Sequence, residues 1–218
     1  MRSAYYDQLD LIVDELVAMT QQVQLSVGRA THALLTADSD IAAQVVAGDA
    51  RIDALRDRVE DQVFEVMALQ QPVAGDLRML VAAVRMVADL ERMGDLSVHV
   101  AKVAQLRNPE LAVPEPLRPT VERMAQVAVQ MVGAAGEVIA HRDVEAAERL
   151  ESEDEEMDEL RRHSFRIMLS DDWAHGVEAA IDVALLGRYY ERIADHAVSL
   201  GRRVVYLVTG HTPSHTDV

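Results

Sequence analysis

The chain has 218 residues, and half of them are apolar, which is enough to bury a substantial core. Its 37 Asp and Glu residues outnumber its 21 Lys and Arg residues. The resulting net charge of −16 argues against binding to nucleic acid or to anionic lipid, because both require a cationic surface. The absence of cysteine excludes disulfides, thiolate catalysis and thiolate-bound metals. No apolar run approaches the ~18 residues of a membrane span and the N-terminus lacks a signal peptide, so we expect a cytoplasmic protein without direct membrane insertion.

The first half of the chain shows the periodicity of long helices. Apolar residues recur at every third or fourth position of the first segment, which predicts an amphipathic helix with the stripe Leu9, Ile12, Leu16, Met19, Val23, Val27, Ala30 and Leu34. Asp38, within the sequence Asp-Ser-Asp, is typical of an N-cap that starts a new helix. A second apolar stripe over 52–69 predicts the next helix, and a third helix is expected over about 76–107, after Pro72.

The second half repeats this plan, with helices expected over about 117–141, 144–169 and 175–208. Asp143 stands before the second of these helices, as Asp38 stands before its counterpart. Four of the six prolines fall within 108–119, which indicates a linker, because proline breaks helices. We therefore expect a first three-helix bundle over 1–107, the linker over 108–119, a second bundle over 120–209 and a flexible tail over 210–218.

The two halves also align residue by residue. A constant offset of 105 residues relates Met19, Val27, Asp53, Leu55 and Arg56 to Met124, Val132, Asp158, Leu160 and Arg161. In the third helix the offset is 100 residues, because the turn before that helix is five residues shorter in the second half. We interpret the chain as an all-α protein of six long helices, arranged as two tandem repeated three-helix bundles from a duplicated unit.

The strongest local motif is Glu-Arg-Met-Gly-Asp at 91–95, which recurs as Glu-Arg-Ile-Ala-Asp at 191–195. The spacing of four residues places both carboxylates of a motif on one helix face. We expect them to continue an apolar stripe that faces the core, formed by Leu77, Leu80, Val84 and Val98 in the first half and by Val177, Ile181, Ala184 and Val198 in the second. A carboxylate that faces a core is costly unless it is paired, protonated or bound to a metal. The candidate residues are Glu91, Arg92 and Asp95, and Glu191, Arg192 and Asp195.

A second set of acids lies on the preceding helix of each half. Asp49 and Asp53 flank its apolar stripe in the first half, and Asp154 and Asp158 do so in the second. If these helices pack antiparallel to the motif helices, four carboxylates converge in each half. Such a donor set suits Mg²⁺, Mn²⁺ or iron, or Zn²⁺ with help from His196.

The same acids also suit an ordinary charged helix surface. Asp53, Asp57 and Asp61 continue a spacing of four residues, which is typical of a solvated face. The acids could then be neutralised as ion pairs by Arg56, Arg58, Arg92 and Arg192. The residues alone leave metal binding and ion pairing open.

The duplicated unit with these two motifs resembles the PhoU family of phosphate-uptake regulators over about residues 5–210. The resemblance implies a cytoplasmic, often dimeric protein that carries metals on paired acidic motifs. It also implies a signalling role, in which the protein couples the ATPase subunit of a phosphate ABC importer to a sensor histidine kinase and represses the phosphate-starvation response. The metal ligands implied are Asp49, Asp53, Glu91 and Asp95, and Asp154, Asp158, Glu191 and Asp195, with His196.

The chain departs from the family pattern at two positions in the first half and at one position in the second. The histidine that follows the motif is His196 in the second half, but the first half has Leu96. The family glutamate seven positions after the motif aspartate is replaced by Lys102 and by Arg202. Each of these cations could occupy the place of a metal by its charge.

The alternative function is that of a carboxylate-bridged metal-binding bundle, either an enzyme or a storage protein. Ferritin-like enzymes of this kind use Glu-x-x-His motifs, and none is present in the chain. The nucleotide-binding, zinc-protease and serine-hydrolase motifs are also absent. We therefore expect no enzymatic activity.

Overall fold

The computed structural model describes residues 2–211 and contains six long helices, with no strand in that range. Their bounds are α1 (Arg2–Thr36), α2 (Ser39–Gln70), α3 (Ala74–Arg107), α4 (Arg118–His141), α5 (Val144–Met168) and α6 (Gly176–Thr209), with the short 3₁₀ helix η1 (Glu115–Leu117) before α4. This confirms the all-α prediction. No helix in the described part of the chain is long and apolar enough to cross a membrane.

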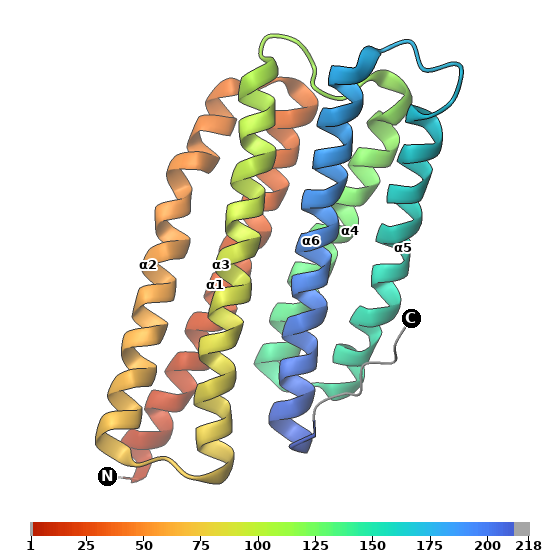
Figure 1. Ribbon diagram of the computed structural model, residues 1–218. Coiled ribbons are helices and arrows are strands. Elements are labelled where there is room, and N and C mark those ends of the chain that lie inside the picture. Colours follow the sequence, from red (N-terminus) through yellow and green to blue (C-terminus); the bar gives the residue numbers. More distant parts are fainter. Residues whose placement is uncertain (1, 212–218) are drawn as a thin grey trace.

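Four helices form the centre of the bundle and two flank it. Helices α1, α3, α4 and α6 pack on one another, whereas α2 packs on α1 and α3, and α5 packs on α4 and α6. Figure 1 shows α2 and α5 at opposite edges, with α3 and α6 side by side between them. One continuous hydrophobic core runs through both repeats. The predicted domain boundaries stay a prediction, and residues 212–218 of the expected tail lie outside the described residues.

The second helix of each repeat begins at an equivalent aspartate. The Asp38 carboxylate accepts a hydrogen bond from the backbone N–H of Ile41 at 2.9 Å, and Asp143 accepts one from Ala146 at 2.9 Å. Each bond satisfies a backbone donor that the first turn of a helix otherwise leaves unpaired. The aspartates at these two positions are therefore the N-caps that the sequence predicted.

Helices α1 and α4, which are equivalent in the two repeats, approach each other closely at two glycines. A Cβ at Gly133 would lie 2.5 Å from Nε2 of Gln24, and one at Gly136 would lie 2.6 Å from Oγ1 of Thr20. Gln24 also donates a hydrogen bond across this contact to the carbonyl of Val129 at 3.0 Å. The missing side chains of the glycines allow this short distance between the helices.

A buried polar group joins α3 of the first repeat to α6 of the second. Asp89 is 8% exposed, and its carboxylate accepts hydrogen bonds from Arg203 Nε at 2.7 Å and from His196 Nδ1 at 3.1 Å. Burial alone would raise the pKa of Asp89, but the hydrogen bonds and positive charge of these partners lower it below its ordinary value. Asp89 is therefore held as a charged carboxylate between the repeats.

Two further contacts fix the direction of this α3–α6 seam. Arg107 Nε lies 2.6 Å from Oδ2 of Asp182, and the rings of His99 and Tyr189 stack with centroids 5.3 Å apart. Residues of increasing number in α3 thus contact residues of decreasing number in α6, so the two helices are antiparallel, as Figure 1 also shows. The two acidic motifs consequently lie at the same level of the bundle.

Candidate functional site

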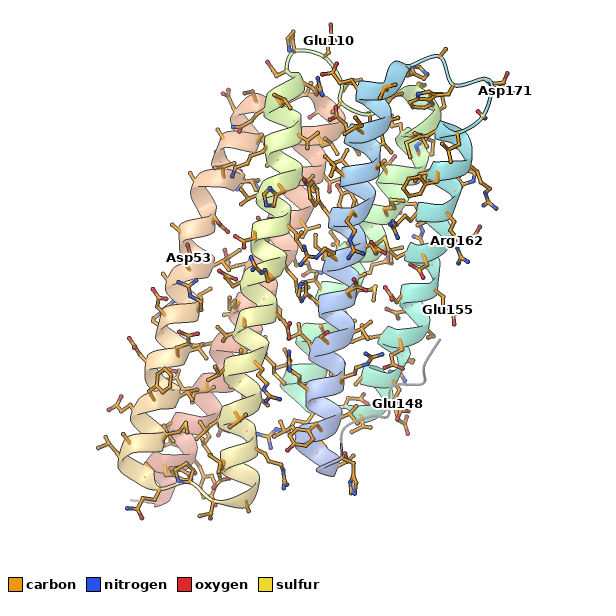
Figure 2. The ribbon with its side chains drawn as sticks, in the orientation of Figure 1. Asp53, Glu110, Glu148, Glu155, Arg162 and Asp171 are labelled. Atoms are coloured by element: carbon orange, nitrogen blue, oxygen red, sulfur yellow. The ribbon has the colours of Figure 1, made fainter. Side chains whose placement is uncertain are left out.

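The structure brings four acids of the first repeat together. These residues form the first carboxylate cluster: Asp49 and Asp53 of α2, and Glu91 and Asp95 of α3. The pKa of Asp49 is raised above its ordinary value, first by burial and then by the negative charges of the other three acids. Figure 2 shows Asp53 midway along α2, at the edge of the bundle.

The second repeat holds the equivalent group. The second carboxylate cluster consists of Asp154 and Asp158 of α5, and Glu191 and Asp195 of α6. Burial, followed by the charges of the other three acids, raises the pKa of Asp154 to about 6. The pKa of Asp195 is raised as well, by burial and by Glu191. Each repeat therefore gathers four carboxylates between its second and third helices.

An arginine bridges the two helices of each cluster. In the first cluster, Arg56 Nη1 of α2 lies 3.2 Å from Oε1 of Glu91 and 3.3 Å from Oδ1 of Asp53. In the second, Arg161 Nη1 of α5 lies 2.7 Å from Oε1 of Glu191. Arg56 was predicted from the sequence as a partner of the acids, but Arg161 was not. The offset of 105 residues between Arg56 and Arg161 is the signal that predicts the same role for Arg161.

Other cations complete the two clusters. Arg92 donates to Oδ2 of Asp95 at 3.1 Å, and Arg188, which sequence reasoning missed, donates to Oε2 of Glu191. The positive charges of Lys102 and Arg202 lower the pKa values of Asp49 and Asp154, respectively, and so partly offset the effect of the acidic neighbours. Arg192 is exposed and has no hydrogen-bond or ion-pair partner among residues 2–211, although the motif predicted a role equal to that of Arg92.

His196 lies next to the second cluster, but its Nδ1 atom points to the other repeat. That atom donates to Asp89 of α3, and the charge of the ring acts on Asp195 only as a neighbour. The histidine is thus part of the seam between the repeats. The predicted role of His196 as a metal ligand stays a prediction.

The expected core-facing stripes are correct only in part. Leu80, Val98 and Val198 are buried as predicted, but Leu77 is 39% exposed, Val177 75% and Ile181 53%, so these three residues do not face the core. The buried face of α3 contains Leu90 beside Leu80. Both α3 and α6 carry apolar residues over a wide arc, so a spacing of three or four residues fits more than one face. The clusters therefore lie at the edge of the core, where α2 and α5 cover the motif helices.

Comparison with known proteins explains the duplication. The PhoU domain matches residues 16–104 and again residues 121–204. The chain belongs to the PhoU family. It is 46% identical over 213 residues to the phosphate-specific transport system accessory protein PhoU homolog 2 of Mycobacterium tuberculosis, covering 98% of this chain and 100% of the relative. It is 44% identical to PhoU homolog 1 of Mycobacterium leprae, covering 100% and 98%.

Solved PhoU structures share the fold. The phosphate transport system regulatory protein PhoU from Streptococcus pneumoniae superimposes with a TM-score of 0.87 at 22% identity, over 96% of this chain and 99% of that one. PhoU from Pseudomonas aeruginosa gives a TM-score of 0.83 at 28% identity, over 95% and 100%. The resemblance to PhoU inferred from the motifs is thus confirmed over nearly the whole chain.

The residues of this PhoU chain do not fit a metal ion as the structure places them. Within residues 2–211, no three His, Asp or Glu side chains are positioned to hold one. A metal ligand must direct a free lone pair at the ion. Oxygens of Glu91 and Glu191 instead accept hydrogen bonds from arginine. Metal binding by the eight acids therefore stays a prediction, as does the identity of the metal, which we expected to be Mg²⁺, Mn²⁺, iron or Zn²⁺.

Proposed function

We propose that this PhoU-family chain is a negative regulator of phosphate uptake and of the phosphate-starvation response. In this proposal it is a cytoplasmic homodimer that contacts the ATPase subunit of a phosphate ABC importer and a sensor histidine kinase. The observation that carries the proposal is the duplicated PhoU domain at residues 16–104 and 121–204, in a chain that matches its relatives over nearly its whole length. Those relatives are named as accessory proteins of a phosphate-specific transport system.

Two features support action by protein contact rather than by catalysis. The acids that would form a catalytic centre are engaged by arginines in both repeats, which leaves them poorly placed as acids, bases or ligands. Large apolar side chains are also exposed where α5 ends and α6 begins, notably Leu169 and Val177. Exposed apolar side chains that lie near one another are typical of surfaces that a partner covers.

Binding and signalling can be tested together. We expect the tagged chain to retain the ATPase subunit and the kinase in pull-downs. We also expect a deletion strain to express a phosphate-starvation reporter even when phosphate is plentiful. The plasmid-borne chain should restore repression, with empty vector as the control. Normal repression in the deletion strain, together with no binding to either partner, would contradict the proposal.

The alternative, a carboxylate-bridged metal enzyme or storage bundle, makes a different prediction. It requires stoichiometric redox metal in the purified chain and oxidase activity that chelation abolishes. Elemental analysis of protein purified without chelators separates this function from regulation by contact.

A further inference from the structure

We infer that Arg56 and Arg161 are the built-in cations of the two carboxylate clusters, and that they bridge the acids of each cluster without a metal ion. The family resemblance implies metals at these acids, and the side chains of this chain disagree with that implication. The inference concerns how the clusters are held together, and it goes beyond the proposed regulatory function.

The arginine bridge occurs twice in the chain. Arg56 reaches from α2 to Glu91 of α3, and Arg161 reaches from α5 to Glu191 of α6. The two arginines occupy equivalent positions of the repeat, and so do the two glutamates. The same helix pair is therefore joined by the same chemistry in each half. A guanidinium keeps its charge at every physiological pH, so this bridge is permanent in a way that a bound ion is not.

Both carboxylate oxygens of Glu191 are engaged by arginine. Oε1 accepts from Arg161 at 2.7 Å, and Oε2 accepts from Arg188. A divalent ion binds carboxylate oxygen at about 2.0–2.6 Å, so an ion on Glu191 would share an oxygen with one of these guanidinium groups and bring two positive charges close together. Arg161 is further held by the ring of Phe165, whose centroid lies 5.6 Å from its Cζ. Displacing this arginine therefore costs two contacts at once.

Each cluster also faces further cations of the chain. The acids of the first cluster face Arg56, Arg92 and Lys102, although Arg56 also pairs with Asp57. Those of the second face Arg161, Arg188 and Arg202, although Arg202 also pairs with Glu151. Part of the electrostatic attraction that normally retains a divalent ion is thus satisfied by the chain itself.

The test compares metal content and thermal stability in matched variants. Arg56→Gln and Arg161→Gln remove the bridging charge. Arg58→Gln and Arg162→Gln are the controls, because these neighbours are mostly exposed and lie outside the clusters. Figure 2 shows Arg162 on the outer side of α5. Each protein is purified without chelators, analysed for Mn, Fe and Zn, and melted with EDTA or with added Mn²⁺.

We expect the wild-type chain and both controls to hold substoichiometric metal and to melt at the same temperature with EDTA and with Mn²⁺. Arg161→Gln and Arg56→Gln should gain Mn²⁺ binding. For either variant, Mn²⁺ at a hundredfold excess over its Kd should raise the Tm by roughly 5–10 °C.

Two results would overturn the inference. One is a wild-type chain that holds an ion per repeat and loses thermal stability when EDTA removes it. This measurement needs no variant, so it stands even if an arginine variant fails to fold. The other is a pair of folded arginine variants that gain no affinity for Mn²⁺. Neither result affects the pull-downs of the proposed function, so the two proposals can fail separately.

Discussion

Arg203 of α6 donates a hydrogen bond to Asp89 of α3 at 2.7 Å, and this partly buried ion pair crosses from one repeat to the other. Asp89→Asn removes the charge and leaves the guanidinium without its counter-ion at the seam. We expect this substitution to lower the free energy of unfolding by about 1–3 kcal/mol, less than for a fully buried pair because water reaches Arg203. Urea denaturation measures the loss. Asp171→Asn, in an exposed loop, is the control and should stay within about 0.5 kcal/mol of wild type.

The same pair predicts a dependence on pH. The pKa of Asp89 in the folded chain is below its ordinary value, so the charged carboxylate stabilises the fold. This stabilisation is complete at a pH above the pKa of Asp89 in the unfolded chain, and it is lost as the pH falls through the pKa in the folded chain. The difference between wild type and Asp89→Asn should therefore shrink in acid. A difference that stays constant from neutral pH down to the acid transition would contradict this assignment.

Asp154 predicts the opposite change of stability with pH. Its folded pKa is raised to about 6, so the folded chain binds this proton more tightly than the unfolded chain does. Stability from this group therefore falls as the pH rises from about 4 to about 6. Asp154→Asn should raise the free energy of unfolding at pH 7 by about 1 kcal/mol, which allows for solvent screening, and should flatten the slope. Urea denaturation at pH 5 and pH 7 measures both effects.

Glu155→Gln is the control for this prediction, because Glu155 is exposed and points away from the bundle in Figure 2. If Asp154→Asn destabilised the chain at pH 7 and Glu155→Gln did not, the carboxylate would be a net stabilising group. That result would contradict the crowding of like charges described for the second cluster.

The contact between α1 and α4 predicts opposite effects at two glycines. A Cβ at Gly136 meets the stiff side chain of Thr20 at 2.6 Å, so Gly136→Ala should cost about 1–3 kcal/mol by overpacking. Gly28 of α1 has nothing within 4 Å of its Cβ position, so Gly28→Ala should stabilise the chain by about 0.4–1 kcal/mol. Thermal melts distinguish the signs. Equal losses of stability in Gly136→Ala and Gly28→Ala would contradict the close approach of α1 and α4 at Gly136.

The two N-caps predict equal losses. Asp38→Ala and Asp143→Ala each remove one hydrogen bond to a first-turn N–H, and each should cost about 1 kcal/mol of stability. Asn at either position keeps the acceptor and serves as the rescue. Failure of Asn to restore stability would mean that charge, rather than the capping bond, accounts for the effect.

The sequence predicted the helices well because their ends carry strong local signals. Asp38 and Asp143 cap α2 and α5, and Pro119 lies in the first turn of α4, so the expected and observed helix starts agree within a few residues. The repeat also showed which acids converge, because equivalent helices must pack in equivalent ways. These properties depend on local geometry and on the order of elements along the chain.

The role of the acids could not be predicted in the same way. The same spacing of Glu91 and Asp95 serves a metal ion or an arginine, and only the direction of Arg56 and Arg161 distinguishes the two in the structure. The turn of His196 toward Asp89 depends on packing between α3 and α6, and no periodicity in a single helix contains that information. The contact of Arg188 with Glu191 is different, because these residues are three positions apart within α6.

The antiparallel seam has an electrostatic consequence for the whole molecule. The macrodipoles of α3 and α6 oppose each other, and Arg107 at the end of α3 lies beside Glu178 in the first turn of α6. Acids and bases are also nearly equal in number on these two helices, whereas α2 has seven acids against three arginines and α5 has nine against four. The net charges of −4 on α2 and −5 on α5 make up more than half of the chain's −16, so the long-range field comes mostly from the two outer flanks and attracts a cationic partner to them first.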